Sequence, residues 1–412
     1  RKLNNEVEVT GYGTIKFFHR TAGDYRIINR YGVGLTTRYV NKAVLWGRNN
    51  EFSVGVDLFA QPARIEYYDN IHGAKGDQLN QLENENISNT GFYISENFEI
   101  IKKRFFVLLT GRYDHVNYTV EEETLPARSD HKPYSAFTPK LAFNFKITQE
   151  IALYTSYGLS FDAPAGNEMG SPDPAFLFNP DLEPQESGNF EMGIKGGRFR
   201  WESDFLRRLT WEATFFNIRL NNEIVPFEVL GDVYYRNAAK TNRTGAEIGL
   251  NAEVLKNLNF GVSYTWSKFD YLSYTARTIE EDSTGTLFTV DKDFSGNIVP
   301  SVPVNNLYLV LSYAYPLGRH VHLFAKASYQ GISGMYVDDA NSDKTAGYNL
   351  LNGLGGIDLR FGKFNTVVSG GVNNIFDVTY VGFTNTNSAN KRFYEAGAPR
   401  DWFLTVNLGY TF

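Results

Sequence analysis

The chain of 412 residues has no cysteine, only three methionines and only six histidines. The absence of cysteine excludes a disulfide framework and any metal site built on thiolates. The formal net charge is −6, and a nucleic-acid-binding protein would need a clustered basic face instead. The composition therefore directs attention away from nucleic acids and disulfide-stapled folds.

Long apolar runs are also missing. The longest are short stretches such as 105–109 and 307–311, whereas a membrane-spanning helix needs about 18 or more consecutive apolar residues. The mean hydropathy of −0.33 leaves two structural classes open, a soluble β protein or a membrane barrel with a polar lumen. The sequence also lacks the H-E-x-x-H, G-x-S-x-G and G-x-x-x-x-G-K motifs, so no enzyme is expected.

What the sequence has in abundance is a two-residue alternation. In the stretch 258–266, Leu258, Phe260 and Val262 alternate with Asn259, Gly261 and Ser263. Successive side chains of a strand point to opposite faces, so we expect the first set to face lipid and the second to face the interior. Similar stretches occur at 52–60, 139–147, 246–254, 307–315, 364–372 and 402–412.

The spacing between these stretches alternates between short and long. We expect short links near 47–51, 101–104, 146–150, 255–258, 317–320 and 362–365, with a longer one near 197–208. Between them come connections at 20–30, 66–88, 119–133, 160–187, 230–233, 269–303, 331–347 and 378–400, most of them long. Such sorting is typical of a meander threaded through a membrane, with the short turns on the periplasmic side.

Counting the alternating stretches gives about 16 strands over residues 1–412, with no composition break that would indicate a second domain. Tyrosine and tryptophan gather near strand ends, as in the aromatic girdles of membrane barrels. The sequence therefore predicts an all-β protein, a transmembrane antiparallel β-barrel.

Three segments resemble a known family. Residues 371–377 read Gly-Val-Asn-Asn-Ile-Phe-Asp, residues 394–400 read Tyr-Glu-Ala-Gly-Ala-Pro-Arg, and the chain ends in Phe412. In the middle, 157–164 and 179–185 are followed by Asn237-Ala238 and Gly245-Ala246-Glu247. Together, in this order, they are similar to the motifs of TonB-dependent outer-membrane receptors.

The resemblance implies a barrel of 22 strands around a plug domain, preceded by a signal peptide and a TonB box. With about 16 strands and no plug in this chain, we expect it to be the C-terminal part of such a receptor. The implied partners are outer-membrane lipid, the TonB energy-coupling complex and the outer-membrane assembly machinery, which would read Leu408, Tyr410 and Phe412. No cofactor and no nucleic-acid partner are implied.

The implied function is energised import of a scarce nutrient across the bacterial outer membrane, with a ferric-siderophore or ferric-citrate type complex as cargo. Cobalamin or an oligosaccharide is an alternative cargo, and a passive porin or a soluble β-rich binding protein is an alternative class. An anionic iron chelate would need cations and aromatic rings in the outer loops. The candidate ligand-binding residues are Arg128, Lys132, Arg236, Arg277 and Tyr336.

One loop has the spacing of a calcium site. Residues 339–343 read Asp-Ala-Asn-Ser-Asp, but Lys344 stands where a calcium loop has its turning glycine, and no glutamate follows at the twelfth position. We therefore expect a solvated loop and no metal ligands.

Overall fold

The computed structural model describes residues 4–21, 23–124, 129–173, 175–200, 205–229, 232–237, 240–281, 287–388 and 392–411. These residues form strands and connections and contain no helix. Accordingly, none of the described residues lie in a helix long and apolar enough to cross a membrane.

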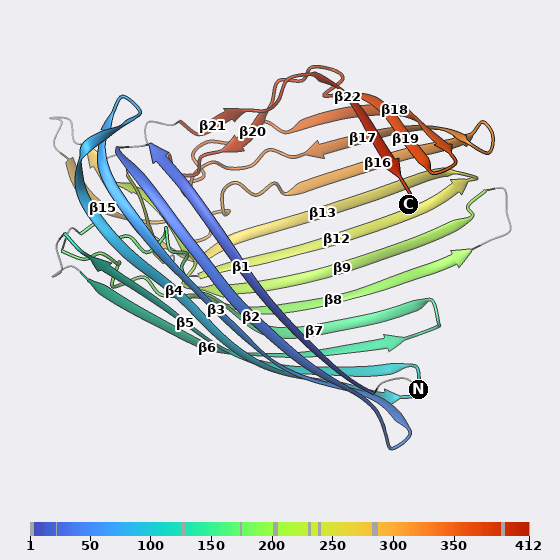
Figure 1. Cartoon of the computed structure of the whole chain (residues 1–412), viewed down its shortest axis with the longest axis horizontal. Helices are drawn as coiled ribbons and strands as arrows, with labels where there is room; N and C mark the ends of the chain where they lie inside the picture. Colours follow the sequence, from blue (N-terminus) through green and yellow to red (C-terminus); the bar gives the residue numbers. More distant parts are fainter. Residues whose placement is uncertain are drawn as a thin grey trace. The chain divides into compact units, whose positions relative to one another are not determined.

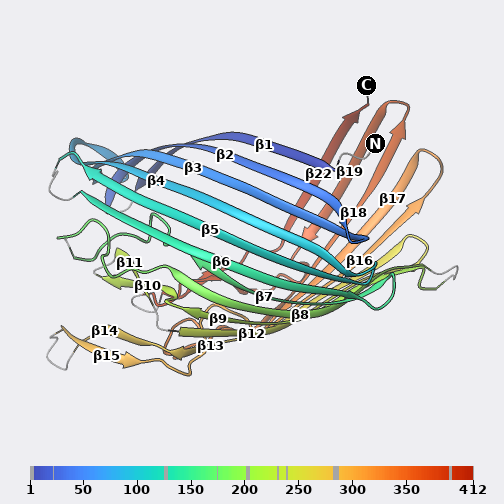
Figure 2. The same ribbon diagram turned by 90° about the horizontal axis from the view of Figure 1, so that it is seen from below.

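Sixteen of the described strands pair in one sheet, each with its neighbours in chain order (Figures 1 and 2). They are β1 (Asn5–Thr21), β2 (Asp24–Leu45), β3 (Arg48–Ile71), β4 (Ala74–Ile101), β5 (Phe105–Glu122), β6 (Asp130–Lys146), β7 (Ile151–Asp162), β8 (Gln185–Arg200), β9 (Arg208–Asn221), β12 (Lys240–Leu255), β13 (Leu258–Ser273), β16 (Asn305–Pro316), β17 (Val321–Ile332), β18 (Tyr348–Phe361), β19 (Phe364–Asn373) and β22 (Asp401–Tyr410).

Three small two-stranded sheets lie in the long connections. They are β10 (Ile224–Val229) with β11 (Asp232–Asn237), β14 (Thr275–Glu281) with β15 (Leu287–Asp293), and β20 (Val381–Thr384) with β21 (Tyr394–Ala396). Each adds hairpin structure outside the main sheet and gives its connection a defined backbone.

The contacts divide the chain into two compact units. Unit 1 comprises residues 1–144, 156–189 and 220–239, and unit 2 comprises residues 145–155, 190–219 and 240–412. The division passes through β6 to β9, so each unit holds whole strands and parts of these four.

The expected separation of faces in β13 is confirmed by its pairing. Phe260 lies opposite Ala252 and Leu311, and Val262 lies opposite Leu250 and Leu309. On the other face Asn259 lies opposite Glu253 and Ser312, and Gly261 lies opposite Asn251 and Val310, the one apolar side chain among these partners. Because directly paired residues share a face, the sheet has an apolar face and a polar face here.

Several aromatic rings lie flat over a glycine on the neighbouring strand. Tyr93 is paired with Gly55, and a Cβ on Gly55 would lie 2.5 Å from its ring. The same distance separates Phe324 from a Cβ on Gly356 and Phe403 from a Cβ on Gly371, again in directly paired positions. Any larger residue at these glycines would displace the ring.

The short links are confirmed as turns. In unit 1 they join β2 to β3 and β4 to β5, and in unit 2 they join β6 to β7, β12 to β13, β16 to β17 and β18 to β19. Since consecutive strands are antiparallel, these turns lie at the same end of the strands within each unit.

The long loop expected at 66–88 is wrong. Strands β3 and β4 continue through this stretch and meet in a two-residue turn at His72 and Gly73, with Asn70 Oδ1 accepting a hydrogen bond from the Gly73 amide at 2.7 Å. The region 20–30 is likewise mostly strand. Strands that project beyond a membrane meet water on both faces, so polar residues replace the alternation by which a strand is recognised.

Candidate ligand-binding loops

The connection between β7 and β8 in unit 1 folds onto the polar face of the sheet. Its residues Met169, Phe178 and Leu182 are buried against Tyr118 and Tyr134 of β5 and β6. Val116 and Val120 complete the cluster, with Phe161, Leu177 and Ile224 packed at its edge. Burial of these apolar groups gives the loop a small hydrophobic core of its own.

Hydrogen bonds fix this loop to the strands beneath it. The Tyr118 hydroxyl donates to the Pro164 carbonyl at 2.5 Å, and the Tyr134 hydroxyl donates to the Leu182 carbonyl at 2.9 Å. The ammonium of Lys132 donates to the carbonyls of Asn179 and Pro180 at 2.9 and 2.7 Å. These bonds therefore fix the position of the Asn179–Pro180 turn above the strands.

The β10–β11 hairpin is bound to the same loop. The side-chain amide of Asn179 donates to the Tyr235 carbonyl at 3.1 Å. Asn237 accepts from the Glu183 amide at 2.7 Å and donates to the Glu183 carbonyl at 2.8 Å. These bonds join the segment 179–185 to Tyr235 and Asn237. Because 179–185 and Asn237 belong to the motifs that resemble the receptor family, the physical role of these motifs is to hold one outer connection against the next.

Removing the Tyr134 hydroxyl should loosen this loop. Tyr134→Phe leaves the buried Leu182 carbonyl without its donor, which costs about 1–3 kcal/mol in local stability. We expect faster proteolysis within 163–184 in the folded protein. Tyr25→Phe is the control, because the Tyr25 hydroxyl bonds His19 at an exposed site; equal cleavage of the two variants would contradict the anchoring role.

The polar face of unit 1 carries arginines that are already neutralised. Arg112 bonds Asp57 at 2.6 Å and Asp114 at 2.7 Å. Arg30 bonds Glu85 at 3.0 Å, and Arg26 bonds Asp24 at 2.8 Å. Carboxylates hold these guanidinium groups in place, so they are not free to receive an anionic ligand without exchanging partners.

Three connections of unit 2 meet around one buried carboxylate, that of Asp339. Asp339 is 4% exposed. It accepts hydrogen bonds from the Tyr271 hydroxyl at 2.6 Å and from the Asn387 side-chain amide at 2.9 Å. The Asn387 side chain in turn accepts from the Asp339 amide at 2.9 Å, and Asn341 exchanges two bonds with Ile298 at 2.8 Å.

The solvated loop expected at 339–343 is therefore wrong for Asp339. Its oxygens accept hydrogen bonds from protein donors that come from distant parts of the chain. Farther out, the Tyr394 hydroxyl donates to Asp343 at 2.6 Å, and this hydrogen bond raises the pKa of Tyr394 to about 12.

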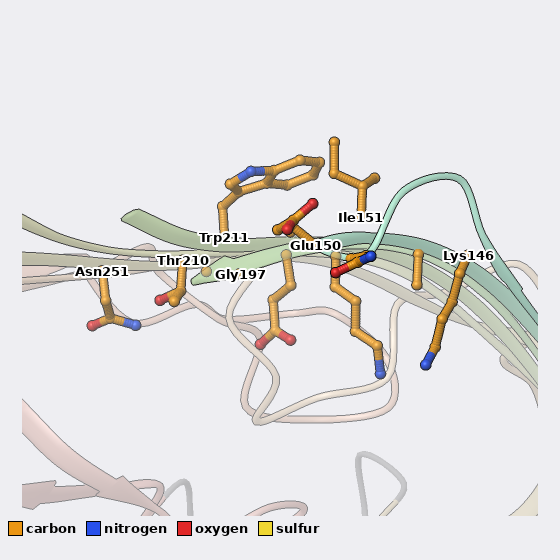
Figure 3. A pocket seen from close by; sticks show the side chains of 13 residues that line it. Lys146, Glu150, Ile151, Gly197, Thr210, Trp211 and Asn251 are labelled. Atoms are coloured by element: carbon orange, nitrogen blue, oxygen red, sulfur yellow. The ribbon is translucent and has the colours of Figure 1, made fainter. Parts of the chain in front are cut away.

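A separate pocket of about 500 Å³ lies in unit 2 beside the turn between β6 and β7 (Figure 3). Lys146, Thr210 and Asn251 project to one side of the sheet, and Trp211 and Ile151 project to the other (Figure 3). Lys195, Glu212 and Gly249 also line it. Sequence reasoning missed this pocket, although the alternation in β9 and β12 places 210, 212, 249 and 251 on one face.

The structure places three of the five candidate ligand residues. Lys132 and Arg236 both lie in unit 1. Lys132 donates to the Asn179 carbonyl, and Arg236 follows Tyr235, whose carbonyl accepts from the Asn179 side chain. Tyr336 lies in unit 2, with the Lys344 ammonium 5.2 Å from its ring centroid. Arg128 and the side chain of Arg277 lie outside the described residues, as does Phe412 of the expected assembly signal.

The family model described as TonB dependent receptor-like, beta-barrel matches residues 3–375. The chain belongs to this family. A probable TonB-dependent siderophore receptor, PiuA of Acinetobacter baumannii, is 25% identical over 334 residues, which cover 79% of this chain and 41% of that protein. The vitamin B12 transporter BtuB of Photobacterium profundum is 24% identical over 322 residues, covering 75% and 45%.

Solved structures give the same fold. The ferric citrate transporter FecA in its unliganded form matches with a TM-score of 0.71 at 16% identity, covering 99% of this chain and 59% of that one. The TonB-dependent receptor-like chain spans about half the length of the curated relatives that it matches. Its sheet is that of an outer-membrane β-barrel, in which the polar face lines the lumen and the apolar face meets lipid.

Proposed function

We propose that this TonB-dependent receptor barrel belongs to an importer of a ferric-siderophore or ferric-citrate type complex, driven by the TonB energy-coupling complex. The observation that carries the proposal is the family match over residues 3–375 together with the siderophore receptor among the relatives. The outer-membrane assembly machinery is a further proposed partner, through the last strand with Leu408 and Tyr410 exposed on its apolar face.

The lumen wall of unit 1 supports a role for the loops in binding. Since Arg26, Arg30 and Arg112 are paired with carboxylates, we look to cations of the connections for contacts with an anionic chelate. Lys132 contacts the Asn179 turn, Arg236 is adjacent in sequence to Tyr235, which also contacts it, and Arg128 precedes Lys132 in sequence. We propose that Lys132, Arg236, Arg128 and Arg277 supply charge-assisted bonds to the ligand and that Tyr336 supplies a ring for stacking.

The test is a binding titration on the full-length protein with ferric citrate, a ferric catecholate, cobalamin and a maltooligosaccharide. We expect one of the iron complexes to bind, and the double variant Arg236→Gln with Arg277→Gln to weaken binding at least tenfold without lowering the amount of assembled barrel. The control variant Arg319→Gln with Lys363→Gln removes the same charge from the short turns β16–β17 and β18–β19, which lie at the strand ends away from the long connections, and should bind like the parent.

Binding of the sugar alone would overturn the iron proposal while leaving the family intact. Binding of cobalamin alone would favour cobalamin as the imported cargo, an alternative that the similarity to BtuB supports. An unchanged affinity in the arginine variant would move the ligand contacts to other residues.

A further inference from the structure

Two neighbouring turns of unit 1 form an amphipathic patch at the periplasmic ends of the strands. The first joins β2 to β3 at Trp46 and Gly47, and the second joins β4 to β5 at 102–104. Both lie at the end of the unit where the chain begins (Figure 1), since Asn5 of β1 is paired with Asn41 of β2. We call Trp46, Arg48, Ile100, Ile101, Lys102, Lys103 and Arg104 the basic turn patch.

One buried carboxylate ties the two turns together. Glu99, which is 1% exposed, accepts a hydrogen bond from the Asn49 amide at 2.8 Å and another from the Lys103 amide. The Trp46 and Phe98 rings are in edge-to-face contact, with centroids 6.1 Å apart. Because the buried Glu99 carboxylate bonds backbone amides of both hairpins, it fixes the two turns relative to each other. The cationic side chains of the patch remain on the surface.

The residue at the tip of the first turn is unusual. Trp46 has φ +50° and Gly47 has φ +73°, a pair of left-handed residues for which hairpins prefer Asn-Gly. A bulky residue with positive φ is strained, yet Trp46 is 89% exposed, more than any other large apolar residue described. A tryptophan that gains no burial and weakens its turn points to a role outside the chain.

The residues around Trp46 indicate whether its side chain lies in water or at a membrane interface. Ile100 and Ile101 at the end of β4 are also exposed, and three cations of the second turn follow them directly, Lys102, Lys103 and Arg104. Exposed apolar side chains at the end of a hairpin are unfavourable in water. At a membrane interface, however, an indole and aliphatic side chains meet acyl chains, while the indole N–H and the neighbouring cations reach the headgroups. Phe98, on the lipid face beside Trp46, places the patch next to the bilayer.

We infer that the basic turn patch is a docking site for anionic phospholipid headgroups in the leaflet that faces the periplasm. Trp46, Ile100 and Ile101 rest at the level of the upper acyl chains, and Lys102, Lys103 and Arg104 bind phosphate oxygens. The inference rests on the membrane location of the barrel and is independent of the proposed cargo.

Quenching of Trp46 fluorescence tests the inference. Full-length protein with Trp46 as its single tryptophan is reconstituted in phosphatidylcholine vesicles that contain brominated phosphatidylglycerol or brominated phosphatidylcholine. We expect phosphatidylglycerol to associate about tenfold more strongly, since each nearby cation adds attraction to an anionic headgroup. The triple variant Lys102→Gln, Lys103→Gln, Arg104→Gln should reduce this preference to near one.

The matched control is Lys256→Gln, Arg319→Gln, Lys363→Gln, which removes the same charge from three exposed turns of unit 2 and should keep the preference. Equal quenching by both lipids in the unaltered patch would overturn the inference, as would an equal loss in both triple variants. Absence of quenching by either lipid would also overturn it, because Trp46 would then lie in water.

Trp46→Asn supplies a second, independent measurement. Asparagine suits the left-handed position, so the variant should be at least as stable as the parent in neutral detergent. In phosphatidylglycerol vesicles the same variant should be less resistant to urea than the parent. A gain in stability in both media would mean that Trp46 contacts no lipid.

Discussion

Replacing Val262 by arginine is expected to lower the free energy of unfolding of the barrel in lipid by about 2–4 kcal/mol. Val262 lies on the apolar face of β13, between Leu258 at the turn and Trp266 in the middle of the strand. Its paired neighbours are Leu250 and Leu309. A guanidinium group there lies near the middle of the hydrocarbon, where it finds neither water nor a carboxylate.

The measurement is urea unfolding in phosphatidylcholine vesicles, followed by intrinsic fluorescence. Ser263→Arg is the matched control, because Ser263 lies on the polar face opposite Gly249 and an arginine there can reach lumen water. We expect the control to lose less than about 1 kcal/mol, as is usual for substitutions at hydrated sites. A larger loss for Ser263→Arg than for Val262→Arg would reverse the assignment of the two faces.

The second large effect is expected at Asp339. Asp339→Ala leaves the Tyr271 hydroxyl and the Asn387 amide without their acceptor in a buried site, and each such donor costs about 1–3 kcal/mol. The loss should appear as local opening of the segments 333–347 and 385–388, while the paired strands stay intact. Hydrogen exchange of these backbone amides measures it, with protection falling by about two orders of magnitude.

Asp343→Ala is the comparison for this variant. Asp343 is exposed and accepts a hydrogen bond from the Tyr394 hydroxyl at the outside of the same loop. We expect a much smaller loss of protection there. If the two alanine variants lost protection equally, burial of the Asp339 carboxylate would not be what organises the three connections.

Local alternation was enough to predict strands wherever one face meets lipid. In β13 and β22 the apolar residues recur every second position because the bilayer requires it, and the faces of β13 follow directly. The β3–β4 hairpin shows the limit of this signal. Beyond the membrane the requirement ends, so the stretch 77–86 looked like a loop although residue 79 and residues 81–86 are paired with β3.

The roles of single loop residues depended on partners distant in sequence. Lys132 was expected to meet ligand from its charge alone, and its bonds to the Asn179 and Pro180 carbonyls could not be inferred without knowing how 163–184 folds back. Asp339 was misread for the same reason, since Tyr271 and Asn387 lie 68 and 48 positions away. Charge and spacing report what a residue can do, and the fold decides which partner it meets.

The rings that lie over glycines have a consequence for how the barrel acquires its register. A slip of one position between neighbouring strands would turn apolar residues into the lumen and is rejected by the bilayer. A slip of two positions keeps every residue on its proper face, so the bilayer cannot detect it. It would, however, place the Tyr93 ring over Ser53 or Asp57, and the Phe403 ring over Ser369 or Asn373, where a Cβ occupies the space that Gly55 and Gly371 leave open. The glycines thus help to specify the strand register, because they disfavour sterically the two-residue slip that the pattern of apolar and polar faces would tolerate.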